Sequence, residues 1–340
     1  MRDYITFAAA RSTQAEQLGL AIGRVRDQLE TRASAGELEG DGPVFVGIGA
    51  SFAAACAPVW VLRSRGIHSW RLGAGEYPLP FPVTTHPIIG ISQSGRSAET
   101  LAVLESVDPA LRYSVVNTSP SPLSLVTDRS ISLGSIPDSY ASTIGYTATV
   151  AALGMIADRW NAGTIDPGWA TLADTFRQAE EQLTASIRGL ASLFADSGSA
   201  DFVGAGPAVG SAEAGALLFR EVARIHSTGM STRQYLHGSM ESAGDGVHVL
   251  FGDTRELEVA TTLSEAGHRV ILISSEEVGQ TDTLRTVQLP KLPASQRAIL
   301  EILVMQILVG EVAAQHGIDV EEFVFTNADT KVVAAGGPLP

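Results

Sequence analysis

Short apolar runs alternate with longer segments of helical periodicity along the first half of the chain. Four runs are predicted as strands, at PVFVGIGAS (43–51), PIIGISQSG (87–95), RYSVVNTS (112–119) and SISLG (130–134). Helices are predicted at 51–66, 97–107 and 142–160. A continuous apolar run is typical of a strand buried on both faces of a parallel sheet. Strands and helices that alternate in this way predict βαβ units and an α/β fold.

The second half of the chain repeats this order of elements. Its predicted strands are 200–208, 246–253, 269–275 and 286–290, and its predicted helices are 211–226, 254–268 and 296–317. Equivalent elements of the two halves are roughly 160 residues apart in the sequence, and an internal duplication is the simplest explanation of this repeat. We therefore predict two α/β domains, each with helices on both faces of a parallel sheet.

Four segments follow from this pattern. An N-terminal helix occupies 1–32, a first α/β domain 33–165, a second α/β domain 166–320 and a C-terminal tail 321–340. The tail fits neither cycle of strands and helices, and we expect it to fold back over a site.

Composition and charge narrow the classes of partner. The chain has 23 basic and 37 acidic residues, a net charge of −14, so nucleic acid and anionic membrane are not expected to bind it. Cys56 is the one cysteine, which excludes an internal disulfide and a cysteine-rich zinc site. The N-terminus becomes polar too early for a signal peptide, and no uninterrupted apolar run of about 18 residues appears. We expect a cytoplasmic protein.

Two predicted strand ends in the first half carry small hydroxyl side chains. Ser51 follows the first strand, and Ser92, Gln93, Ser94 and Ser97 follow the next one. Ligands of open parallel sheets bind beyond the carboxyl ends of the strands, and each of these loops precedes a helix whose free N–H groups favour an anion. Serine and glycine are also common there as helix caps and turn residues. The paired loops favour a phosphate site.

Other phosphate and metal motifs are missing or incomplete. The chain has two lysines, and neither follows a glycine in the way a P-loop requires. Gly47-Ile-Gly49 and Gly204-Ala-Gly206 both lack the third glycine of a dinucleotide fingerprint. A serine-hydrolase elbow is approximated weakly around Ser51. No metal-ligand spacing occurs, and no cofactor is expected.

Three residues outside these loops are candidates for proton transfer or ligand contact. Glu221 lies at the edge of the apolar face of a predicted helix, where burial would raise its pKa toward that of a general base, although an ion pair with Arg224 is the alternative. His237 lies in a Gly/Ser loop and could carry a proton, although a loop histidine often has no such role. Lys331 lies on the tail.

Several of these segments together resemble the SIS (sugar isomerase) domain family. They are GIGAS, ISQSGRSAET, YASTIGYTA, GALLFREVARIHS and YLHGSMES, and they are most similar to the isomerase half of the glutamine–fructose-6-phosphate aminotransferases. The resemblance covers nearly the whole chain. It implies two flavodoxin-like, three-layer αβα SIS domains in tandem.

The resemblance also implies roles for single residues. The loop that holds the sugar phosphate matches Ser92, Gln93, Ser94 and Ser97, with Ser51 and Ser142 completing the site. Glu221 matches the glutamate that moves a proton between C1 and C2 of the open-chain sugar. His237 matches a ring-opening histidine that a neighbouring subunit supplies, which implies a homodimer with a shared active site. Lys331 matches a lysine of the tail that closes on the sugar.

Two departures from the aminotransferases shape the expected reaction. Leu218 stands where the family has a lysine, three residues before the glutamate, and the chain starts at the SIS region without a glutaminase domain. We therefore expect a phosphosugar isomerase-type enzyme that deaminates or deglycates a 6-phosphorylated amino sugar. The alternatives are a simple aldose–ketose phosphosugar isomerase and a non-catalytic regulator that binds a sugar phosphate.

Overall fold

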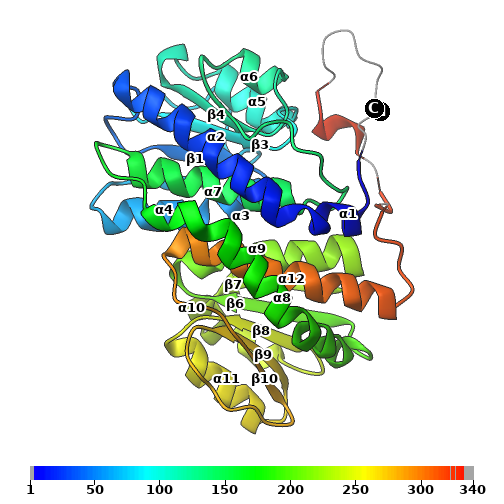
Figure 1. The fold of residues 1–340 in the computed structure, drawn as a ribbon. Coiled ribbons are helices and arrows are strands. Elements are labelled where there is room, and N and C mark those ends of the chain that lie inside the picture. The colour runs from blue at the N-terminus through cyan, green and yellow to red at the C-terminus, as the bar shows by residue number, and fades with distance from the viewer. Residues whose placement is uncertain (1–3, 322, 326, 333–340) are drawn as a thin grey trace. The chain divides into compact units, whose positions relative to one another are not determined.

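The computed structural model describes residues 4–332 apart from 322 and 326. The chain forms two compact units, Met1–Ala173 with Val324–Pro340, and Asp174–Phe323. Each unit contains one five-stranded sheet in which all strands are parallel (Figure 1). The predicted α/β class with two parallel sheets is confirmed.

The sheet of the first unit has the strand order β2-β1-β3-β4-β5. Its strands are β1 Val44–Gly47, β2 Trp70–Gly73, β3 Ile88–Ser92, β4 Arg112–Val116 and β5 Arg129–Ser132. β1, β3 and most of β4 are buried, as the apolar runs predict. β2 was not predicted, because it is a half-exposed edge strand whose residues, WRLG, form no apolar run.

Helices cover both faces of this sheet. They are α1 Phe7–Ser12, α2 Gln14–Ser34, α3 Ala50–Ala54, α4 Cys56–Ser64, α5 Ala98–Glu105, α6 Pro122–Leu125 and α7 Ile144–Arg159, with 3₁₀ turns at Pro109–Leu111 and Pro167–Thr171. The expected N-terminal helix is broken at Thr13, and the expected helix at 51–66 is broken at Ala55. α7 is buried along almost its whole length and packs against α2 and α4.

Side chains of α2 bind the outer edge of β5. Gln28 donates to the carbonyl of Ser132 over 2.9 Å and accepts from the N–H of Ser132 over 3.0 Å. Arg24 donates to Leu133 O over 2.9 Å, and Arg32 donates to Ser130 O over 2.7 Å. These bonds satisfy backbone groups that an edge strand otherwise leaves unpaired.

The sheet of the second unit has the order β10-β9-β8-β6-β7. Its strands are β6 Ser199–Gly204, β7 His226–Ser231, β8 Val247–Phe251, β9 Arg269–Ser274 and β10 Leu284–Gln288. Read from β7, this is the order of the first sheet, and the pair β8–β9 has the same register as the pair β3–β4. For example, Ile88 pairs with Arg112 in the first sheet, as Val247 pairs with Arg269 in the second. The predicted repeat is confirmed.

The second unit surrounds its sheet with α8 to α12. The helices are α8 Leu172–Gly189, α9 Val209–Leu218, α10 Thr232–Leu236, α11 Arg255–Glu265 and α12 Ala294–Gln315, with 3₁₀ turns at Leu190–Phe194, Gly206–Ala208 and Ser239–Ser242 and a π turn at Phe219–Ala223. The helix expected at 211–226 is therefore too long. It ends in the π turn, and His226 already begins β7, an edge strand that was also not predicted.

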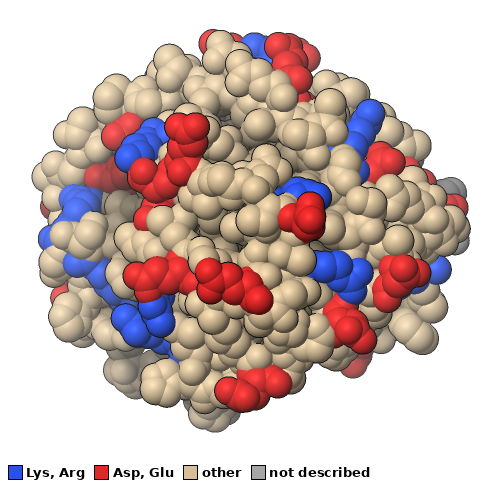
Figure 2. Space-filling view, turned by 90° about the horizontal axis from the view of Figure 1, so that it is seen from below, with Lys and Arg blue, Asp and Glu red and all other residues tan. Residues whose placement is uncertain are grey.

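α12 is the one helix, among the residues that the structure describes, that is long and apolar enough to cross a membrane by length and composition. In its most apolar 18-residue segment, 78% is buried inside the structure, as in the core helix of a folded domain. On the face shown in Figure 2, acidic and basic side chains are interspersed.

Candidate functional site

The loop after β3 gathers buried hydroxyl groups at the carboxyl edge of the first sheet. Ser92, Ser94 and Ser97 are 2%, 4% and 6% exposed. The hydroxyls of Ser92 and Ser97 lie 3.0 Å apart, and the hydroxyl of Ser94 accepts from the N–H of Arg96 over 3.2 Å. Ser97 precedes α5 without capping it through its side chain. The loop therefore offers hydroxyl donors at the start of a helix, which suits an anion.

Gly95 gives this loop its shape. Its φ of +61° lies in the left-handed region, and a Cβ there would lie 2.0 Å from the Ser121 hydroxyl oxygen. The Gly95 carbonyl also accepts from the N–H of Leu123 over 3.0 Å. The glycine thus lets the loop pack against the segment that follows β4.

Ser51 lies in the first turn of α3, directly beyond β1, and is half-buried. Gly49 caps α3 with a φ of +58°, and a Cβ at Gly47 would lie 2.9 Å from the Cβ of Ser51. The two glycines therefore let the helix start close to the strand end. Because β1 and β3 are neighbours in the sheet, Ser51 and the loop after β3 lie at the same edge.

Gln93 and Ser142 converge on a buried carboxylate, Asp138. The Gln93 side-chain amide donates to Asp138 Oδ2 over 2.8 Å, and the Ser142 hydroxyl donates to the same oxygen over 2.9 Å. The hydroxyl of Thr143 and the N–H of Gly145 add bonds of 2.7 and 2.9 Å. Asp138 is 6% exposed. It therefore fixes two of the predicted phosphate ligands at the start of α7.

Sequence reasoning missed Asp138. Its signal was an acidic residue in the segment PDSYAST directly before a long helix, where carboxylates commonly accept helix N–H groups. Gly145 is needed beside it, because a Cβ there would lie 2.2 Å from the Gln93 side-chain nitrogen.

The C-terminal tail pairs with the loop after β3. Lys331 forms an antiparallel bridge with Ser97, and it is exposed. The N–H of Val332 donates to Arg96 O over 2.9 Å, and Arg96 Nε donates back to Val332 O over 2.7 Å. The tail therefore brings Lys331 to the loop that holds the predicted phosphate ligands.

Glu221 lies in the π turn Phe219–Ala223 rather than in a regular α-helix. The turn ends at Arg224, whose φ of +55° is left-handed, and the chain then enters β7. Burial raises the pKa of Glu221 to about 7. Within the described part of the chain, the Glu221 carboxylate has no hydrogen bond or ion pair, so the alternative pairing with Arg224 is not formed.

His237 is exposed and ends α10, where its N–H donates to the carbonyls of Arg233 and Gln234. Glu221 precedes β7, whereas α10 follows it, so the six-residue strand His226–Ser231 separates the two candidates. A strand of this length spans roughly 20 Å. One copy of the second unit therefore does not bring His237 to Glu221.

Similar solved structures identify the fold. The C-terminal domain of glucosamine-fructose-6-phosphate aminotransferase from Francisella tularensis matches with a TM-score of 0.78 and 20% identity, over 93% of this chain and 97% of that one. The chain has the tandem SIS fold. The fold is also similar to that of tagatose-6-phosphate ketose/aldose isomerase from Escherichia coli, with a TM-score of 0.75, 17% identity and coverage of 90% of this chain and 91% of that one.

A third similar structure is glucosamine-6-phosphate deaminase from Thermotoga maritima, with a TM-score of 0.71 and 17% identity over 93% of this chain and 98% of that one. In sequence, the chain resembles glutamine–fructose-6-phosphate aminotransferases. The Arabidopsis thaliana protein is 24% identical over 95% of this chain, and the Zymomonas mobilis protein 27% over 80%. The chain spans about half the length of these relatives, 50% and 48%. No family model matches it.

Within the described residues, no group of three His, Cys, Asp or Glu side chains is placed to hold a metal ion. The residues that structure and sequence bring together are thus of two kinds. One is the hydroxyl loop of the first SIS domain, with Asp138 and the tail. The other is Glu221, a lone carboxyl group in the second SIS domain.

Proposed function

We propose that the chain binds a 6-phosphorylated sugar and moves a proton between C1 and C2 of its open-chain form. We further propose that the substrate is an amino sugar: the proton shift turns its C–N carbon into an imine carbon, and water hydrolyses the imine to a carbonyl with release of ammonia or amine. We also propose that the enzyme works in the cytoplasm. The observation that carries this proposal is Glu221, whose pKa of about 7 results from burial without a charged partner.

In this proposal the phosphate is held by the hydroxyls of Ser51, Ser92, Ser94 and Ser97. Hydroxyl donors bind a phosphate without adding bulk, and the first turn of α5 adds backbone N–H groups. Gln93 and Ser142 keep their places through Asp138. Lys331, which the tail brings to Ser97, adds a positive charge at the rim of the loop.

Glu221 is suited to take a proton from one carbon and return it to the next. A general base works best when its pKa lies near the working pH, because it is then ionised and still basic enough to take the proton. Leu218, 6% exposed on the last turn of α9, adds no charge that would lower the pKa of Glu221. In the proposed reaction, the proton that leaves C2 or C1 is carried on the Glu221 carboxyl group.

Ring opening in this proposal requires a homodimer. His237 lies beyond the opposite end of β7 from Glu221, so a second copy of the chain would supply the histidine that acts beside Glu221. The resemblance to the SIS enzymes supports this arrangement. His237 would then transfer a proton to the ring oxygen as the ring opens.

The test is a panel of glucosamine 6-phosphate, fructose 6-phosphate, tagatose 6-phosphate and fructosamine 6-phosphate, incubated with the wild-type chain and with Glu221→Gln. Ammonia release, amine release and ketose–aldose interconversion are measured in parallel. Release of ammonia or amine by the wild-type chain alone supports the proposal. Ketose–aldose interconversion without release of ammonia or amine would indicate a simple isomerase instead. Ligand-induced thermal stabilisation without product would indicate a regulator and contradict the proposal.

A further inference from the structure

The carboxyl edge of the second sheet carries an acidic side chain at a position where the first sheet has a serine, in a shorter loop that joins β8 Val247–Phe251 to α11 Arg255–Glu265. In the first sheet β3 ends at Ser92, which pairs with Val116, and Ser94 follows two residues later. In the second sheet β8 ends at Phe251, which pairs with Ile273, and Asp253 follows two residues later. Counted from the strand ends, Asp253 therefore stands in the place of Ser94.

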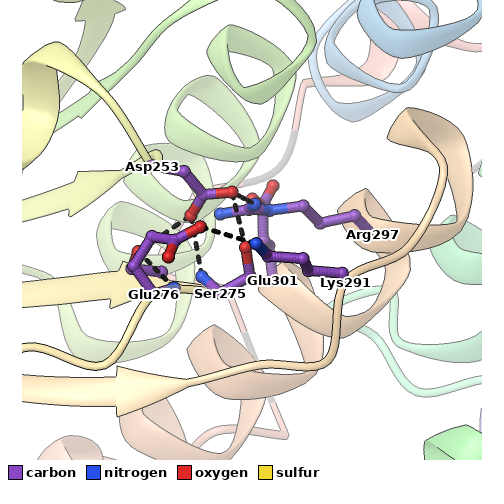
Figure 3. Close-up of polar contacts among 7 residues, drawn as sticks. Asp253, Ser275, Glu276, Lys291, Arg297 and Glu301 are labelled. Atoms are coloured by element: carbon purple, nitrogen blue, oxygen red, sulfur yellow. Dashed lines mark hydrogen bonds and ion pairs between the residues drawn. The ribbon is translucent and has the colours of Figure 1, made fainter.

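Asp253 is surrounded by hydrogen-bond donors (Figure 3). Its Oδ1 accepts from the Ser274 hydroxyl over 2.8 Å and from the Ser275 N–H over 2.7 Å. Its Oδ2 accepts from the Ser275 hydroxyl over 2.7 Å and from Nη1 of Arg297. A backbone N–H, two hydroxyls and a guanidinium are donors that a phosphate group would use.

The Arg297 guanidinium is itself held in place. Its Nε donates to Glu301 Oε1 over 2.8 Å, and Glu301, 1% exposed, also accepts from the Ser211 hydroxyl of α9. Nη2 of Arg297 is buried and has no hydrogen-bond partner among the described residues. Arg297 therefore binds Asp253 and Glu301 and still has the N–H groups of Nη2 free for a further hydrogen bond.

A second ion pair lies beside this cluster. Lys291 Nζ lies 2.9 Å from Glu276 Oε1, and both side chains are largely exposed. Figure 3 shows the Lys291 and Glu276 side chains beside Asp253 and Arg297.

The two loops thus differ in where the anion comes from. In the first domain the residue two positions beyond the strand is Ser94, which brings no negative charge of its own. In the second domain a side chain of the chain itself takes the donors. We propose that Asp253 is a built-in anion that occupies a second cradle, the phosphate-type donor cluster of Ser274, Ser275 and Arg297, so that each chain binds phosphate at the first-domain loop alone. This goes beyond the proposed reaction, and the part about the first-domain loop rests on the proposed function.

The variant Asp253→Ser tests this, because it gives the second cradle the residue of the first. Binding of inorganic phosphate is measured by titration calorimetry and by thermal shift, with sodium chloride at matched ionic strength. We expect one phosphate per wild-type chain and two per Asp253→Ser chain. The exposed Asp282→Ser serves as the matched control and should keep one. Ser94→Asp is the reciprocal change, and it should fill the first cradle and abolish that binding.

Each result bears on the inference. Two phosphates per wild-type chain would overturn it, and this measurement decides the matter even if Asp253→Ser does not fold. A folded Asp253→Ser chain that gains no phosphate would also overturn it. No binding to the wild-type chain together with one phosphate on Asp253→Ser would remove the proposed role of the first loop but support the role of Asp253.

Discussion

The side-chain nitrogen of Gln93 lies 2.8 Å from Oδ2 of Asp138, so a predicted phosphate ligand is held by a buried acidic group. Asp138 also holds Ser142 and the N–H of Gly145 at the start of α7. The carboxylate therefore occupies the positive end of α7, and the start of α5 is left for a bound anion. Affinity for phosphate should depend on a residue that does not itself contact the phosphate.

Asp138→Asn should weaken phosphate binding and lower stability. The asparagine side chain brings an N–H₂ group against donors that need an acceptor, so Gln93 and Ser142 lose their fixed positions. Leaving buried donors unsatisfied costs about 1–3 kcal/mol, which corresponds to roughly a 5- to 150-fold change in an equilibrium constant. Urea unfolding and phosphate titration measure the two effects. The exposed Asp128→Asn is the control, and an unchanged phosphate affinity in Asp138→Asn would contradict the positioning role.

The rate of the proposed reaction should rise with pH through about 7. Burial raises the pKa of Glu221 to that value, and the general base must be ionised to take a proton, so the protonated form below pH 7 is inactive. Glu221→Gln should lose about 10²–10⁴-fold in kcat and keep its affinity for phosphate. The pH profile of kcat for a substrate found in the panel is the measurement. Glu265→Gln, an exposed carboxyl on α11, should keep the wild-type profile.

Stability should fall in acid partly through Asp253. Burial alone would raise the pKa of Asp253, but hydrogen bonds from Arg297, Ser275 and Ser274 outweigh it and hold the pKa well below its usual range. The stability that its ionised form contributes is therefore present above the unfolded-state pKa, near 4, and is lost as pH falls further. We expect Asp253→Asn to be less stable than wild type at pH 7. The difference should shrink as the pH is lowered from about 4.

Denaturant unfolding at a series of pH values measures this convergence. Asp282→Asn, at an exposed position of the same unit, should follow the wild-type curve throughout. A constant gap between Asp253→Asn and wild type down to the acid limit would show that the charge of Asp253 does not stabilise the fold.

Two glycine substitutions should have opposite effects. Gly95→Ala places a Cβ against Ser121 in a left-handed backbone, which costs about 1–2 kcal/mol before the clash is added, and it should disturb the phosphate loop. Gly23→Ala lies in α2 with nothing within 4 Å of the new Cβ, and it should stabilise the fold by about 0.5–1 kcal/mol. Thermal unfolding compares the two variants. Equal stability and equal phosphate binding in both would contradict the role of Gly95.

Sequence patterns predicted the inner strands and one edge strand of each sheet, but they missed the other edge strands, β2 and β7. Runs such as 88–92 are apolar because both faces of the strand are covered, whereas Trp70–Gly73 and His226–Ser231 lie at edges and need no such run. The π turn that carries Glu221 was also not predicted. It inserts one residue into a helical pattern, and the apolar spacing of 211–226 continues through it.

The candidate site could be predicted where its residues are neighbours in sequence. Ser92, Ser94 and Ser97 form one loop and stand out together, whereas Asp138 contacts Gln93 across 45 residues. Asp253 and Arg297 are 44 residues apart, and their pairing depends on how α12 packs beside the second sheet. Contacts of this kind follow from the packing of distant elements, which local periodicity does not record.

The bonds from α2 to β5 have a consequence for assembly. Gln28 and Arg32 occupy outward-facing backbone groups of β5, and Arg24 binds the carbonyl of the next residue, Leu133, so another polypeptide cannot extend the first sheet there. The opposite border of this sheet is β2, with Trp70 38% exposed. Without α2, these backbone groups of β5 would be unpaired, and a strand of another molecule could pair with them. The leading helix thus serves as a guard against aggregation.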